Sequence, residues 1–62
     1  MIVEEIPPAL AGERLDRVVS LLADITRSEA AALVADGYVS VDGEPSVIGK
    51  VRLVAGMTIA ID

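Results

Sequence analysis

The sequence has no cysteine, no histidine, no tryptophan and no phenylalanine among its 62 residues. Without cysteine there is no disulfide and no thiolate metal site, and without histidine a zinc site is nearly excluded. We therefore expect neither a metal nor a cofactor. Because Tyr38 is the single aromatic residue, the core is expected to be small and aliphatic.

Long apolar runs are also missing. Hydrophobic residues make up 53% of the chain, but they occur in runs of a few residues, far short of the roughly 20 that span a bilayer. No charged segment followed by a long apolar one marks a signal peptide. The sequence thus predicts a soluble, cytoplasmic protein. With 62 residues it forms one domain at most, which buries only about 60% of the surface that its unfolded chain exposes.

Basic residues are few: the chain has five Lys and Arg and ten Asp and Glu, which gives a formal net charge of −5. Proteins that bind nucleic acid usually carry an excess of basic residues, because phosphate contacts and counterion release supply most of the affinity. Net charge acts weakly over distance, however, so a local cluster is sufficient for binding. Whether such a cluster exists depends on where five side chains meet: Arg14, Arg17, Arg27, Lys50 and Arg52.

Two short helices are predicted in the first half of the chain. Within residues 14–23, apolar side chains recur at i, i+3, i+4 and i+7, as in a helix with one buried face: Leu15, Val18, Val19 and Leu22. Gly12 is a tolerable N-cap for this helix. The second helix begins at Thr26, which forms a capping-box pattern with Glu29, and ends before Gly37. The connection is so short that the helices must pack against each other.

Short strands are predicted before and after the helices. Residues 2–6 alternate loosely and stop at two prolines, which is typical of an edge strand. Residues 38–41 alternate and lead into Asp42-Gly43, a strong signal for a two-residue hairpin turn with Gly43 at positive φ. Residues 46–54 are expected to be irregular and partly extended. Residues 58–62 alternate again and are expected to pair with the N-terminal strand.

Several polar side chains are candidates for contact with a phosphate backbone. Arg27 opposes the helix dipole in the first turn of the second helix, so its placement indicates an anionic partner. Thr26 and Ser28 carry hydroxyl groups beside it, although capping accounts for Thr26. Asp16 is interpreted as a structural residue rather than a catalytic acid, because no second titratable group of a catalytic type is near it in sequence.

Together these motifs resemble the S4 RNA-binding domain. The residues that carry the resemblance are Arg14-Leu15-Asp16, Thr26 to Ala30, Leu33-Val34, Gly37, Val39 to Gly43, Val51 and Ala55-Gly56. The segment from Ile6 to Arg17 is most similar to the N-terminal domain of ribosomal large-subunit pseudouridine synthases of the RluA/RluD type. The resemblance implies an α+β fold of two packed helices followed by a small bent antiparallel sheet. It also implies that residues 1–62 are a single domain excised from a longer chain, with a catalytic domain C-terminal to it.

The resemblance implies a module that positions a pseudouridine synthase on structured ribosomal RNA. Because the chain has no catalytic constellation and few basic residues, we expect this module to be non-catalytic and to bind RNA weakly by itself, as a monomer. The RNA would lie along the second helix and the hairpin. The RNA-facing positions are Arg14, Arg27 and Ser28, with Arg17, Tyr38, Lys50 and Arg52 as further candidates. Lys50 and Arg52 are alternatively solvated loop charges, and Tyr38 either stacks on a base or packs against the helix. A second hypothesis is a protein-interaction module of the same fold, which docks through the alanine-rich face of the second helix.

Overall fold

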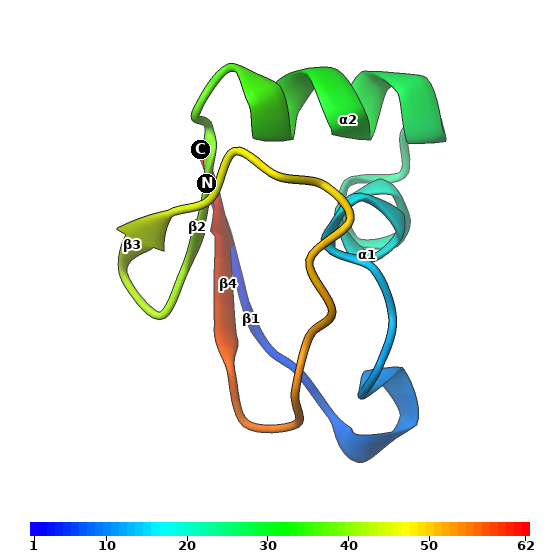
Figure 1. Ribbon diagram of the computed structural model, residues 1–62, viewed down its shortest axis with the longest axis vertical. Coiled ribbons are helices and arrows are strands. Elements are labelled where there is room, and N and C mark those ends of the chain that lie inside the picture. Colours follow the sequence, from blue (N-terminus) through cyan, green and yellow to red (C-terminus); the bar gives the residue numbers. More distant parts are fainter.

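The computed structural model describes all 62 residues. Its elements, in chain order, are β1 (Ile2–Glu5), the 3-10 helix η1 (Pro8–Leu10), α1 (Leu15–Ala23), α2 (Arg27–Ala35), β2 (Val39–Val41), β3 (Glu44–Pro45) and β4 (Thr58–Ile61). The strands form one antiparallel sheet in the order β1-β4-β2-β3. In Figure 1, α1 lies beside the sheet and α2 runs across the top, from above α1 toward the sheet. The predicted α+β fold is confirmed.

The strands pair as the alternating patterns indicate. β1 is an edge strand and pairs with β4 along its whole length, which brings the two ends of the chain together (Figure 1). β4 pairs with β2 on its other side, so it lies inside the sheet. The hairpin between β2 and β3 turns at Asp42 and Gly43, with φ of 51° and 84°. Two consecutive left-handed residues are typical of a type I′ turn, and the predicted positive φ of Gly43 is confirmed.

Both ends of α2 are stabilised by residues that are close to them in the sequence. The Thr26 hydroxyl accepts a hydrogen bond from the Glu29 N–H at 3.1 Å, and the Glu29 carboxylate accepts one from the Thr26 N–H at 3.1 Å. After the helix, Gly37 has φ +86°, and the N–H groups of Gly37 and Tyr38 donate to carbonyls of the last turn. This is the Schellman arrangement, which favours glycine at that position. The predicted capping box and glycine terminus are both confirmed.

The start of α1 differs from the prediction. Gly12 is not the N-cap: it has φ +86° and lies two residues before Arg14, which is the N-cap and makes no side-chain capping bond. The first turn is capped by backbone carbonyls of residues 46–54, a segment that is irregular as predicted. These carbonyls come from a distant part of the chain, so the local sequence carries no sign of them. The prediction of Gly12 as a cap is therefore wrong.

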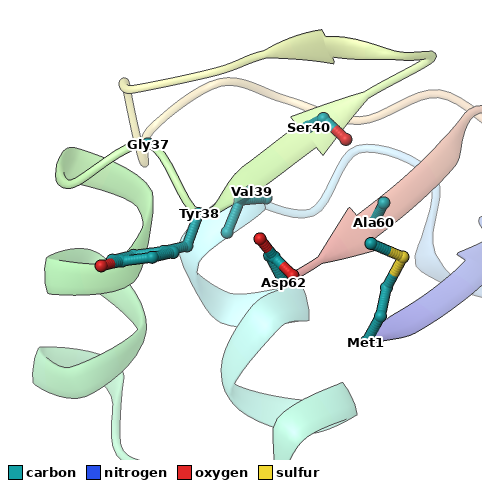
Figure 2. Close-up of a pocket in the computed structure, with 7 residues that line it drawn as sticks. All are labelled: Met1, Gly37, Tyr38, Val39, Ser40, Ala60 and Asp62. Atoms are coloured by element: carbon teal, nitrogen blue, oxygen red, sulfur yellow. The ribbon is translucent and has the colours of Figure 1, made fainter.

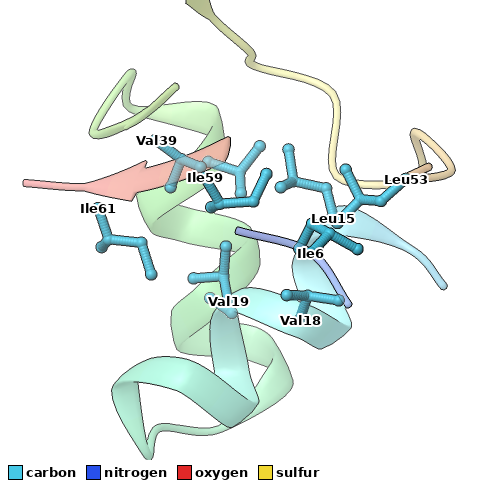
Figure 3. Packing of buried hydrophobic residues seen from close by; sticks show 10 residues of the cluster. Ile6, Leu15, Val18, Val19, Val39, Leu53, Ile59 and Ile61 are labelled. Carbon is cyan, nitrogen blue, oxygen red and sulfur yellow. The ribbon is translucent and has the colours of Figure 1, made fainter. Parts of the chain in front are cut away.

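The core is small and aliphatic, as expected from the scarcity of aromatic residues. In Figure 3, side chains of α1 face those of the sheet. The ten buried residues of the core are Ile6, Leu15, Val18, Val19, Ala30, Val34, Val39, Leu53, Ile59 and Ile61. The predicted stripe of α1 is confirmed for three residues, and Leu22 packs against the core while partly exposed. The burial of Ile6 and Leu53 was not predicted, because Ile6 comes after the end of β1 and Leu53 lies in the irregular segment 46–54.

Candidate nucleic-acid interface

Asp16 is the one buried charged residue, and its carboxylate binds two arginines. Arg14 donates from Nε to Oδ1 at 3.2 Å and from Nη2 to Oδ2 at 2.9 Å. Arg27 donates from Nη2 to Oδ1 at 3.3 Å. A two-pronged contact between guanidinium and carboxylate fixes the arginine in orientation as well as in position. One carboxylate therefore holds the guanidinium groups of Arg14 and Arg27, which we call the arginine pair.

Arg27 has an anionic partner within the chain, the Asp16 carboxylate, whereas its contact with a phosphate stays a prediction. Arg27 is the first residue of α2, where a positive charge opposes the helix dipole. Asp16 lies in the first turn of α1, where a negative charge is favourable. The contact between them joins residues 11 positions apart, so no local pattern indicated it. The interpretation of Asp16 as a structural residue fits its burial and its two ion pairs.

Segment 46–54 brings two more cations to the arginine pair. Arg52 forms an isolated antiparallel bridge with Arg14, and its Nη1 donates to the Gly12 carbonyl at 3.1 Å. Lys50 is exposed and makes no ion pair. It lies between two residues whose carbonyls accept hydrogen bonds from the first turn of α1, at 2.9 and 3.0 Å.

The fifth cation belongs to the same region. Arg17, on the first turn of α1, pairs with Glu13 at 3.1 Å. We call these five side chains the basic cluster: Arg14, Arg17, Arg27, Lys50 and Arg52. Glu13 and Asp16 are the carboxylates that form ion pairs with these cations, so these seven residues sum to +3, and the other eight acidic residues of the chain give −8. A local cluster therefore exists despite the acidic composition.

Two further candidates have different positions. Ser28 is exposed next to Arg27 and makes no side-chain hydrogen bond within the chain, so it lies at the margin of the basic cluster. Tyr38 is half exposed beyond the opposite end of α2, where it lines a shallow pocket near Met1 and Asp62 (Figure 2). The nine residues of α2 span about 13 Å, which separates Tyr38 from Arg27. The structure does not bring Tyr38 to the basic cluster.

The basic cluster offers hydrogen-bond donors and positive charge, which suit it to bind phosphate oxygens. No group of three or more acidic, histidine or cysteine side chains is arranged to hold a metal ion. None of the helices has the length and apolar character needed to cross a membrane.

Comparison with curated proteins gives no match. The S4 domain family, in contrast, matches residues 13–59, a range that runs from the residue before the N-cap of α1 into β4 and includes the whole basic cluster. The fold of two helices and a small antiparallel sheet is compatible with this family. An S4 domain implies a capacity to bind RNA and is not itself catalytic. This chain therefore belongs to the S4 domain family.

Proposed function

We propose that this chain is the RNA-binding module of a ribosomal RNA pseudouridine synthase and positions that enzyme on its substrate. The observation that carries the proposal is the basic cluster, in which all five cations of an acidic chain gather at one region. The similarity of residues 6–17 to the N-terminal domain of these synthases supports the finer assignment. In this proposal the module is a cytoplasmic monomer, and a catalytic domain follows it in the parent chain.

The RNA backbone, in this proposal, crosses the starts of α1 and α2 and segment 46–54. A guanidinium has five donors, of which Arg14 gives two to Asp16 and Arg27 gives one. Both side chains are nearly half exposed, so each keeps donors for phosphate. Lys50 and Arg52 extend the same surface, with Arg17 and Ser28 at its margin. The β2–β3 hairpin carries Asp42 and Glu44 and no cation, which argues against the hairpin contacts that the resemblance implied.

Binding by the domain alone is expected to be weak. Two to four phosphate contacts give a slope of log K against log[salt] of about −1 to −3. The affinity then falls near the non-specific range, with Kd on the order of 10⁻⁴ to 10⁻⁶ M. The catalytic domain supplies the remaining contacts in the parent enzyme.

Lys50→Gln is the sharpest single test, because Lys50 has no partner within the chain whose loss would affect folding. NMR titration with a structured fragment of large-subunit ribosomal RNA is carried out at several salt concentrations. We expect the salt slope to become shallower by about 1, and binding to weaken alike for different RNA sequences, as for a phosphate contact. Ala35→Gln is the control on the exposed alanine face of α2 and is expected to bind as the wild type does.

If the chemical shifts of the basic cluster do not change when RNA is added at low salt, RNA binding by this domain is contradicted. The protein-interaction hypothesis would then be favoured, since Ala31, Ala32 and Ala35 are exposed. That hypothesis predicts binding to a protein partner that does not depend on salt and that Ala35→Gln disrupts. The assignment to a pseudouridine synthase is tested separately by the coding sequence downstream of Asp62. A pseudouridine synthase domain there supports the assignment, and any other continuation overturns it.

A further inference from the structure

A carboxylate in the middle of a phosphate-binding cluster needs an explanation. Asp16 cancels part of the positive charge that attracts RNA, and its side chain is only 8% exposed. Burial of a charge is unfavourable unless it is paired and hydrogen-bonded, and Asp16 is bound by two arginines at 2.9 to 3.3 Å. We infer that Asp16 is a positioning residue for RNA binding, which holds Arg14 and Arg27 in one geometry so that they meet the phosphates as a unit. This inference rests on the proposed function.

The benefit of such an arrangement is preorganisation. A long, free arginine loses rotamer freedom when it binds a phosphate, and that loss opposes binding. Arg14 is already fixed on both oxygens of the Asp16 carboxylate, and Arg27 shares one of them. The donors that remain on the arginine pair are therefore oriented before RNA arrives. The loss of positive charge is offset by this lower cost of ordering.

Asp16 also anchors segment 46–54, which carries Lys50. The Asp16 N–H donates to the Gly49 carbonyl at 3.0 Å. A Cβ atom at Gly49 would lie 3.1 Å from Asp16 Cβ and 3.2 Å from Oδ2, so the segment packs directly on the carboxylate. One residue thus organises cations from three parts of the chain: the start of α1, the start of α2 and the segment before β4.

Asp16→Asn distinguishes two roles of Asp16: positioning the arginine pair, and merely cancelling part of its positive charge. The two roles predict opposite changes in RNA affinity. Asparagine keeps the shape, removes a negative charge and turns an amide toward the Arg14 donors. Under the positioning role, RNA binding weakens by roughly three- to tenfold although the local charge becomes more positive. If Asp16 only cancels positive charge, the variant binds RNA more tightly than wild type. Glu13→Gln is the matched control: it removes the other carboxylate of this region, which is more exposed, and we expect tighter binding.

The arginine side chain gives a second readout that does not involve RNA. In the free protein, the Nε–Hε resonance of Arg14 is expected to be protected from solvent exchange by its bond to Asp16. It should persist in Glu13→Gln and disappear in Asp16→Asn. All titrations are made at a temperature where melting curves show each variant folded, so a general loss of structure does not imitate the effect.

A charge-neutral variant keeps the test decisive if Asp16→Asn does not fold. Gly49→Ala retains every charge and places a methyl group against the carboxylate, so binding weaker than wild type supports positioning and unchanged binding contradicts it. Tighter binding by both Asp16→Asn and Glu13→Gln would overturn the positioning role and leave RNA binding intact. No binding by the wild-type chain at low salt would overturn the proposed function and this inference with it.

Discussion

At the scale of single residues, Asp42 has two roles, of which the sequence indicated one. Its left-handed backbone, with φ 51°, follows from the local Asp-Gly signal for a hairpin turn. Its carboxylate also accepts a hydrogen bond from the Thr58 N–H at 2.9 Å. That partner is 16 residues away, so only the folded sheet brings it within reach. Local conformation was predictable here, whereas the long-range side-chain contact was not.

Gly43→Val tests the turn. Gly43 has φ +84° and a Cβ there would meet no atom within 4 Å, so any effect arises from backbone conformation rather than collision. A β-branched residue resists the left-handed region, and we expect a loss of at least about 1 kcal/mol in the free energy of unfolding. Urea denaturation measures it. Gly43→Asn is the milder control, since asparagine tolerates this region, and equal midpoints for valine and glycine would contradict the assignment.

At the scale of elements, the two helices differ in how their first turns are stabilised. α2 carries its own signals, and its capping box was predicted from Thr26 and Glu29. α1 has no side-chain cap, and its first N–H groups bind carbonyls of segment 46–54. A pattern of local residues cannot reveal a cap supplied from elsewhere, which is why the prediction failed at Gly12 and succeeded at Thr26.

Thr26→Ala should accordingly destabilise the protein through α2. The Thr26 hydroxyl accepts from the Glu29 N–H at 3.1 Å, and loss of such a cap typically costs about 0.5–2 kcal/mol. Equilibrium urea unfolding followed by circular dichroism provides the measurement. Thr26→Ser keeps the hydroxyl and should stay close to wild type. A serine variant as unstable as the alanine variant would mean that packing of the threonine methyl group, rather than the cap, supports the helix.

At the scale of the whole molecule, the arrangement of charge matters more than its sum. The sequence supplied the five cations and left their meeting place open, because they belong to segments far apart in the chain. The arginine pair forms only when α1 packs on α2, and Lys50 joins it only when segment 46–54 docks on α1. A net charge of −5 therefore coexists with a local cluster of cations. β3 and the C-terminal end of α2, the elements to which Glu44 and Asp36 belong, lie away from α1 (Figure 1).

The distance over which the acidic residues Asp36 and Glu44 act on RNA depends on salt, and this dependence gives a final prediction. The molecule measures 25 × 21 × 19 Å, whereas the Debye length is about 30 Å at 0.01 M salt and about 8 Å at 0.15 M. Asp36 and Glu44 should therefore repel bound RNA only at low salt. We expect a variant with both Asp36→Asn and Glu44→Gln to bind RNA more tightly than wild type at 0.01 M salt, and equally at 0.15 M.

RNA titrations at the two salt concentrations measure this difference, and Glu13→Gln serves as the control. Glu13 lies within the region of the basic cluster, so its removal should tighten binding at both concentrations, though less at the higher one. Neither Asp36 nor Glu44 forms an ion pair, so replacing them removes charge without breaking a contact. An equal gain at both salt concentrations would mean that the RNA passes close to these carboxylates. The hairpin would then belong to the interface, and the RNA path over the starts of α1 and α2 would be wrong.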